Sequence, residues 1–281
     1  MDRDSVQVTL LCDNTVEGRG LLAEHGLALW IEGPWGGLLW DTGQTGIVAH
    51  NADRLGLNLA ELKAVVLSHG HYDHTGGLRE VLRRTGPVEV WVHPDVFALK
   101  VARPSQADQP PRSIGLPFSW EELESLGARF RPVSTPQALG PGLWISGEVP
   151  RDPAWEPRDE RLCVWERGGL SPDPLWDDQS LFLATPEGAV VFTGCAHAGL
   201  VNIARRALAV TGTRRVRALL GGTHLRSAPP DLVDQTAAVL DHLGVEQVIA
   251  CHCTGFQALR RLAQQLGERV IPGAVGGKWT F

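Results

Sequence analysis

The feature that most constrains this chain is an apolar strand that runs straight into a cluster of histidines. Residues 62–69 read LKAVVLSH, a continuous apolar run typical of a strand covered on both of its faces. Four ionisable side chains then fall within six positions, namely His69, His71, Asp73 and His74. Because open α/β sheets carry their sites at the carboxyl ends of strands, this segment predicts a buried sheet and a site at its edge.

The rest of the chain alternates between strand and helix patterns, which is typical of the α/β class. In the first half, apolar runs divided by glycine and proline predict strands over residues 6–12, 27–32, 37–40 and 88–93. Helices are expected there over residues 46–57, from Thr75 onward and over 95–102. In the second half, we expect a hairpin over 180–185 and 188–194, strands over 215–222 and 245–251, and helices over 198–210, 229–244 and 255–267.

The middle of the chain, from residue 103 to about residue 178, breaks this alternation. Proline recurs, the apparent strands are short, and four tryptophans are concentrated there, at positions 144, 155, 165 and 176. A wholly solvated loop would not carry so much tryptophan. We therefore expect a single domain over residues 1–281 with a Pro/Trp-rich insertion at about 103–178, which serves in part as a lid or a substrate-facing surface.

Composition and charge exclude several classes of function. A formal net charge of −6 gives no electrostatic reason to expect binding to nucleic acid or to anionic membranes. The first ten residues carry charges where a secretory leader has an apolar core, and no later run is long enough to span a bilayer. The five cysteines are scattered, unlike a disulfide framework. We expect a cytoplasmic protein that acts on a small-molecule substrate, and the sequence leaves its oligomeric state open.

The histidine cluster itself predicts a metal site. Crowding three imidazoles and a carboxylate costs stability unless a positive charge neutralises the carboxylate and takes up the lone pairs. His69 and His71 share one side of an extended backbone, whereas Asp73 and His74 enter the turn that follows. Two groups offset in this way could address two neighbouring ions. Neutral imidazole and carboxylate suit zinc, and also iron or manganese.

Two segments carry a resemblance to a known family. SHGHYDHTGG resembles the His-x-His-x-Asp-His signature of the metallo-β-lactamase superfamily, and LLWDTG resembles the Asp-Thr-Gly strand end that precedes it there. The resemblance implies a four-layer αβ/βα sandwich over essentially the whole chain. It also implies that His69 and His71 bind a first metal ion and that Asp73 and His74 bind a second. Asp41 is then expected to orient these ligands, a role compatible with capping the turn that follows it.

The later ligands depart from the pattern of that family. The segment TGCAH places Cys195 where most members carry a bridging aspartate, with His197 two residues later, and His252 in CHCTG matches the final histidine. Either Cys195 ligates or bridges zinc, or it is a buried thiol and His197 alone closes the first site. Cys251 and Cys253 flank His252 and are expected to pack in the core, although a Cys-x-Cys metal contact is a weaker alternative.

The other histidines divide into two groups. His224 in GGTHL ends a predicted strand, where it could contact substrate or phosphate as a hydrogen-bond donor or general acid, or be an ordinary surface histidine. His93 ends another predicted strand. We assign no role to His25, His50 and His242, which fall in turns or on polar helix faces.

The segments GCAHAGLVNI, GGTHL and CHCTG resemble one branch of the superfamily, the proteins related to 7,8-dihydropterin-6-ylmethyl-4-(β-D-ribofuranosyl)aminobenzene 5′-phosphate synthases. We expect one or two zinc ions, and a hydrolase whose metal-bound hydroxide attacks a phosphorylated small molecule, either a phosphate ester or a phosphodiester. Asp73 would help to orient the nucleophile, and His224 would protonate the leaving group. The alternatives are a transferase or synthase acting on a pterin-like phosphorylated substrate, and a metal-binding or sensing protein with little turnover.

Overall fold

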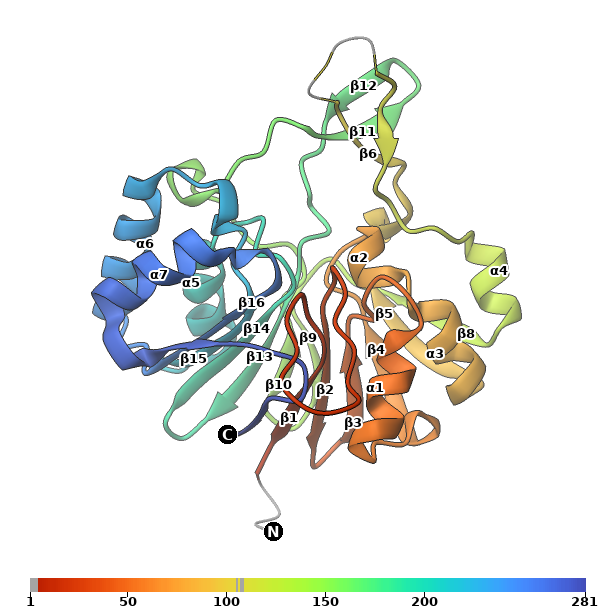
Figure 1. Cartoon of the computed structure of the whole chain (residues 1–281), viewed down its shortest axis with the longest axis horizontal. Coiled ribbons are helices and arrows are strands. Elements are labelled where there is room, and N and C mark those ends of the chain that lie inside the picture. Colours follow the sequence, from red (N-terminus) through yellow and green to blue (C-terminus); the bar gives the residue numbers. More distant parts are fainter. Residues whose placement is uncertain (1–4, 105, 107–108) are drawn as a thin grey trace.

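The computed structural model describes residues 5–104, 106 and 109–281, which fold around two facing sheets (Figure 1). Within these residues each of the two sheets has seven strands. The first has the order β18 (Lys278–Thr280), β1 (Gln7–Cys12), β2 (Ala28–Gly33), β3 (Gly36–Trp40), β4 (Leu62–Val66), β5 (Val88–Val92) and β8 (Ala128–Pro132). The second has the order β17 (Val270–Pro272), β16 (Gln247–Cys251), β15 (Val216–Gly222), β14 (Gly188–Thr193), β13 (Ser180–Thr185), β10 (Leu143–Ile145) and β9 (Gln137–Gly140).

Helices cover the outer face of each sheet, which completes four layers (Figure 1). The first sheet carries α1 (Ile47–Leu55) and α3 (Leu78–Thr85), and the second carries α5 (Leu200–Thr211), α6 (Pro230–His242) and α7 (Phe256–Leu266). One apolar core lies between the sheets and one lies under each helical layer. Each large apolar side chain buried there contributes about 1.5–3 kcal/mol. The predicted αβ/βα sandwich is confirmed. No helix in the described ranges is both long and apolar enough to cross a bilayer.

Most of the expected elements are present, but the helix predicted over residues 95–102 is wrong. A single 3-10 turn covers Pro94–Phe97, and Lys100–Ala102 form strand β6. This strand pairs with β11 (Leu162–Glu166), so a partner distant in sequence overrides the local helical pattern. The helix expected from Thr75 is divided into α2 (Tyr72–Thr75) and α3 by two glycines. A Cβ on Gly77 would lie 2.0 Å from the carbonyl oxygen of Thr42, so glycine permits this close backbone approach.

A third, small sheet stands above the sandwich near α2 (Figure 1). It has the order β12 (Gly169–Pro172), β11, β6 and β7 (Arg112–Ser113). The Pro/Trp-rich region at about 103–178 is therefore divided among all three sheets. It supplies β7, β11 and β12 to the small sheet, β8 to the first sheet, and β9 and β10 to the second sheet. It also contains helix α4 (Trp120–Ser125), which precedes β8.

Candidate metal centre

The candidate site lies where parallel strands of both sheets end at one edge of the sandwich. β3 and β4 run parallel in the first sheet, and β14, β15 and β16 run parallel in the second. The ligand loop, defined as residues 67–75, follows β4. The other candidates follow the three strands of the second sheet. This topology brings the Nε2 atoms of His74 and His252 within 3.1 Å of each other, although the residues are 178 positions apart.

Asp41 follows β3 and supports the ligand loop from behind. Its backbone has a φ of 59°, a conformation that turns the chain out of the strand. Its carboxylate accepts hydrogen bonds from the backbone and the hydroxyl of Ser68, both at 2.7 Å, and lies 2.7 Å from Nδ1 of His74. Burial alone would lower the pKa of His74, but Asp41 and Asp73 outweigh it and raise that pKa to about 9. The carboxylate of Asp41 therefore fixes the orientation of His74.

Three histidines form the first donor group. His69, His71 and His197 each offer a ring nitrogen, and these atoms lie within 4.8 Å of one another. Burial lowers the pKa of all three, that of His71 to about 3, so their rings are neutral near pH 7 and carry free lone pairs. The Nε2 atoms of His71 and His197 are buried without a hydrogen-bond partner among the described residues. An ion bound here would satisfy Nε2 of His197, whereas the nitrogen of His71 that faces the group is Nδ1, 2.9 Å from Nε2 of His69.

A second donor group lies beside the first. Oδ2 of Asp73 is 3.4 Å from Nε2 of His252 and 3.9 Å from Nε2 of His74. Burial opposes the ionisation of Asp73, but the surrounding imidazoles hold its pKa well below the usual value. Asn14 and Asp13 position His252, the first at 3.2 Å from its Nδ1 and the second by accepting its backbone N–H at 2.7 Å.

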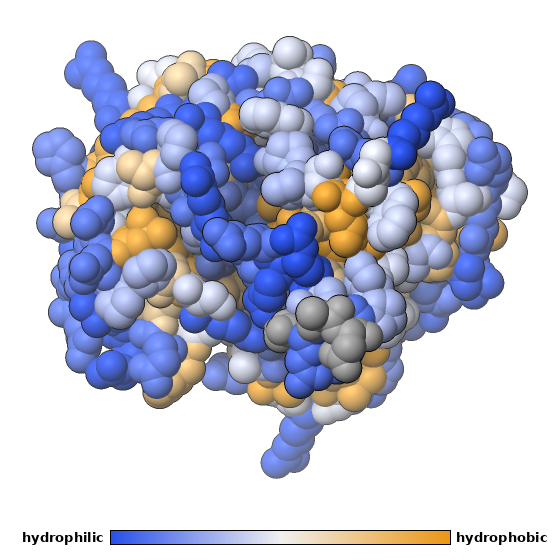
Figure 2. All heavy atoms as spheres, turned by 90° about the horizontal axis from the view of Figure 1, so that it is seen from above, coloured by the Kyte–Doolittle hydropathy of each residue, from blue (hydrophilic) through white to orange (hydrophobic). Residues whose placement is uncertain are grey.

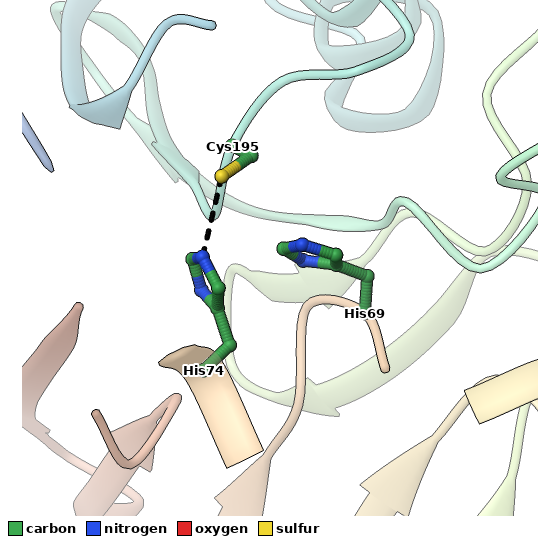
Figure 3. A group of neighbouring side chains, drawn as sticks. All are labelled: His69, His74 and Cys195. Carbon is green, nitrogen blue, oxygen red and sulfur yellow. Dashed lines mark hydrogen bonds between the residues drawn. The ribbon is translucent and has the colours of Figure 1, made fainter. Parts of the chain in front are cut away.

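Cys195 lies between the two groups. Its Sγ is 3.2 Å from Nε2 of His74, and it forms with His69 and His74 a set of donors that point toward one another (Figure 3). The side chain is buried, and burial raises the pKa of its thiol above the usual value. The structure thus places Cys195 at the site and not in the apolar interior.

Two residues of the site, His25 and Cys253, differ from their sequence-based expectations. His25 was assigned no role, yet its Nε2 lies 3.0 Å from Oδ2 of Asp73 and its ring centroid is 5.0 Å from that of His252. Cys253, for which the sequence predicts core packing with a metal contact as the weaker alternative, does not pack in the core but lines the cavity. The chain leaves the strand at His252, where φ is 51°, so side chains no longer alternate and Cys253 turns toward the site. Cys251 does pack in the core between the sheets.

His224 also reaches the site. It has a φ of 51°, its ring centroid lies 4.1 Å from that of His197, and its Nδ1 has no hydrogen-bond partner in the described part of the chain. Burial would lower its pKa, but the charges of Cys253, Asp178 and Asp159 outweigh it, so the pKa is raised. The imidazole therefore holds a proton more readily than an ordinary histidine does.

A buried ion-pair network ties the ligand loop to the small sheet. Nζ of Lys100, on β6, lies 2.8 Å from Oδ2 of Asp173 and 2.9 Å from Oδ1 of Asp177. The other oxygen of Asp177 accepts the backbone N–H of Gly70 at 2.8 Å. Burial opposes a charge on Lys100, but the two carboxylates outweigh it and raise its pKa. The middle of the ligand loop is thus fixed by a charged hydrogen bond.

Members of both donor groups, His71 and His197 of the first and Asp73 and His252 of the second, line a cavity of about 430 Å³. Its wall includes Tyr72, and arginines lie around its mouth. Arg161 pairs with Asp159 at 2.6 Å, whereas Arg103, Arg112 and Arg226 form no ion pair with any residue in the described ranges; all four are exposed. Figure 2 looks down on this end of the molecule, where strongly hydrophilic side chains gather near the middle. The cavity therefore combines buried candidate metal ligands with a positively charged entrance.

The donor set fits transition-metal ions. It contains the neutral imidazoles of His69, His71 and His197, one carboxylate and two sulfur atoms, which come together from the ends of β4, β14 and β16. These are the ligands that zinc takes in proteins, and imidazole with carboxylate also suits iron or manganese. Without an ion, so many crowded and buried polar groups would be costly.

The sandwich and its ligand arrangement define a protein of the metallo-β-lactamase class. The family model described as the metallo-beta-lactamase superfamily matches residues 23–207, and the chain belongs to this superfamily. It is 28% identical over 258 residues to the 7,8-dihydropterin-6-methyl-4-(beta-D-ribofuranosyl)-aminobenzene-5'-phosphate synthase of Methanocaldococcus jannaschii. The aligned region covers 88% of this chain and 86% of that relative. The resemblance predicted from the sequence is thereby confirmed.

Two further proteins are similar over nearly the whole chain. An uncharacterized protein of Methanocaldococcus jannaschii is 29% identical, with 92% of this chain and 94% of that protein covered. The crystal structure of Tm1679, a metal-dependent hydrolase of the beta-lactamase superfamily, superposes with a TM-score of 0.84 at 27% identity and covers 98% of both chains. The likeness therefore extends beyond the ligand loop to the complete fold.

Proposed function

We propose that the chain is a metal-dependent hydrolase that cleaves a phosphate ester or phosphodiester of a small molecule. The observation that carries this proposal is the cavity, which has metal ligands at its floor and unpaired arginines at its mouth. A phosphorylated substrate would be held by charge-assisted hydrogen bonds at the entrance while its ester faces the floor. The similarity to a protein named as a metal-dependent hydrolase supports the same activity.

The residues of the chain then have distinct roles. When bound, zinc, manganese or iron supplies a water-derived nucleophile at neutral pH and withdraws charge from the phosphoryl group. His69, His71 and His197 would hold one ion, and Asp73, His74 and His252 a second. In the reaction a water oxygen forms a bond to phosphorus, the ester P–O bond breaks, and the leaving oxygen takes up a proton. The raised pKa of His224 suits it to donate that proton.

The test is a turnover screen of the metal-loaded protein over phosphodiesters, phosphomonoesters, thioesters and lactones. We expect phosphate esters to be hydrolysed, and His71→Ala to abolish turnover without unfolding the chain. His242→Ala is the matched control, because His242 is exposed at the end of α6, away from the cavity. Equal turnover by His71→Ala, or turnover of thioesters or lactones alone, would contradict the proposal.

A synthase activity is the second candidate, and one observation favours it. The relative from Methanocaldococcus jannaschii is named as a synthase, and its name specifies a 5'-phosphate. A synthase of this kind would use the same ligands and arginines to bind phosphate while a second organic molecule, in place of water, attacks. Products formed in isotopically labelled water separate the two: hydrolysis incorporates the label, whereas group transfer requires the second substrate and incorporates none.

A further inference from the structure

Two sulfur atoms that the histidine signature does not require lie together at the centre of the site. Cys195 follows β14 and Cys253 follows β16, and their Sγ atoms lie within 4.8 Å of each other and of a ring nitrogen of His252. Both side chains are buried. Two ligands bonded to one zinc ion at about 2.0–2.3 Å are at most about 4.6 Å apart. Groups that lie within 4.8 Å of one another are therefore near enough to bind a shared ion.

The backbone is shaped to allow this approach. A Cβ on Gly222 would lie 2.6 Å from Sγ of Cys253 and 2.4 Å from the carbonyl oxygen of Gly194. The N–H of Gly222 also donates to that oxygen at 3.0 Å. Any side chain at position 222 would force the end of β14 away from the turn that carries Cys253. The second glycine of GGTHL thus lets the two sulfurs meet.

Cys195 occupies the more central position of the two. Its sulfur shares a candidate donor group with His69 and His74, another with His197 and His224, and another with His252 and Cys253. It consequently has ligands of both expected ions around it. Cys253 shares a donor group only with Cys195 and His252 among the described residues, so it lies on the side of the second ion.

We propose that Cys195 and Cys253 bind metal as thiolates, Cys195 between the two ions and Cys253 as an added ligand of the second. Each thiol releases its proton to solvent as its sulfur–metal bond forms. Soft thiolate sulfur favours zinc over manganese or magnesium, so the pair would set the metal preference of the site. The inference rests on the metal centre of the proposed function, but it is independent of the reaction that occurs there.

The test loads the metal-stripped protein with cobalt(II) and records its near-ultraviolet absorbance. Thiolate-to-cobalt charge transfer gives an intense band there, which sites made of histidine and carboxylate lack. We expect the band in the wild-type protein, a partial loss in Cys195→Ser and in Cys253→Ser, and complete loss in the double variant. Cys251→Ala is the matched control, because its sulfur belongs to the core and does not line the cavity.

The possible outcomes separate this inference from the proposed function. Cobalt bound without the band overturns thiolate ligation and leaves the hydrolase proposal standing, whereas failure to bind cobalt overturns both. A band that is lost only with Cys195→Ser overturns the role of Cys253. A second measurement needs no variant: zinc should protect Cys195 and Cys253 from alkylation by iodoacetamide, followed residue by residue by mass spectrometry, while labelling of Cys251 stays the same. Equal labelling with and without zinc contradicts the proposal.

Discussion

Nδ1 of His74 lies 2.7 Å from Oδ2 of Asp41, and neither side chain is exposed to solvent. This contact aims the other nitrogen of the ring at Cys195 and His252, which lie 3.2 and 3.1 Å away. A carboxylate behind a histidine ligand fixes its tautomer and makes it more basic. His74 is thus pre-oriented by a residue that precedes it by 33 positions.

We expect Asp41→Asn to weaken zinc binding by about 10- to 100-fold while the fold is retained. The amide keeps the shape of the carboxylate but loses the charge that supports His74. Competition with a chromophoric chelator measures the zinc affinity. The control is Asp53→Asn, which removes an exposed carboxylate 3.2 Å from Arg84 and should leave the affinity unchanged. Equal affinities for wild type and Asp41→Asn would show that the contact does not tune the ligand.

Much of the fold could be predicted because most of its helices and strands have recognisable local sequence patterns. The hairpin of β13 and β14 and the helices α5, α6 and α7 have long, periodic patterns and clear boundaries. The small sheet does not. Its strands β6 and β7 have three and two residues, and β6 is defined by pairing Ala102 with Leu162 across a long segment. Strands this short have no period to detect, so only the tertiary structure identifies them.

The same distinction holds within the site. The spacing of the ligand loop marks its four ionisable side chains because they are close in sequence. His25 reaches Asp73 from a loop between strands, and no local pattern distinguishes it from a surface histidine. Strand alternation predicts that Cys253 points away from His252, but the positive φ at residue 252 ends the alternation. The contact of Asp177 with Gly70 spans 107 positions and has no sequence signal.

The network around Lys100 yields a prediction about stability. Lys100→Met should lower the free energy of unfolding by about 3–5 kcal/mol at neutral pH, because it leaves Asp173 and Asp177 buried without their cation. The raised pKa of Lys100 means that its stabilising charge is fully present below the unfolded pKa and is lost only as the pH rises through the folded pKa. Urea unfolding measures the change. Lys63→Met, at an exposed position of β4, should alter stability little, and an equal effect of both substitutions would argue against the network.

The arginines at the mouth of the cavity predict a change in substrate binding. Arg112, whose guanidinium lies 5.6 Å from the ring centroid of Tyr72, forms no ion pair with the described residues. Arg112→Gln should raise KM for a phosphorylated substrate about tenfold or more and change kcat little, because a contact at the entrance, away from the ester that reacts at the floor, is equally strong in ground and transition states. Steady-state kinetics separates the two constants. Arg131→Gln, which removes an exposed pair with Glu89 on the first sheet, is the control. A fall in kcat alone would instead place Arg112 at the reacting atoms.

Asp178 gives a prediction that depends on pH. Burial raises its pKa to about 6, its Oδ2 accepts the N–H of Ala198 at 2.8 Å, and its Oδ1 has no partner among the described residues. Because the folded pKa lies above the unfolded value, the ionised carboxylate destabilises the fold above about pH 6, and this penalty disappears as the pH falls toward 4.

Asp178→Asn removes that charge and keeps an oxygen for Ala198. It should therefore raise the free energy of unfolding of the metal-free protein by about 1–3 kcal/mol at about pH 7.5, with no gain near pH 4. Urea unfolding of both proteins at the two pH values measures the difference, and Asp53→Asn, which removes an exposed charge, should show no such dependence. A loss of stability at both pH values would contradict this prediction. It would mean that hydrogen bonds accepted by both carboxylate oxygens outweigh the cost of the buried charge, because an amide supplies only one oxygen.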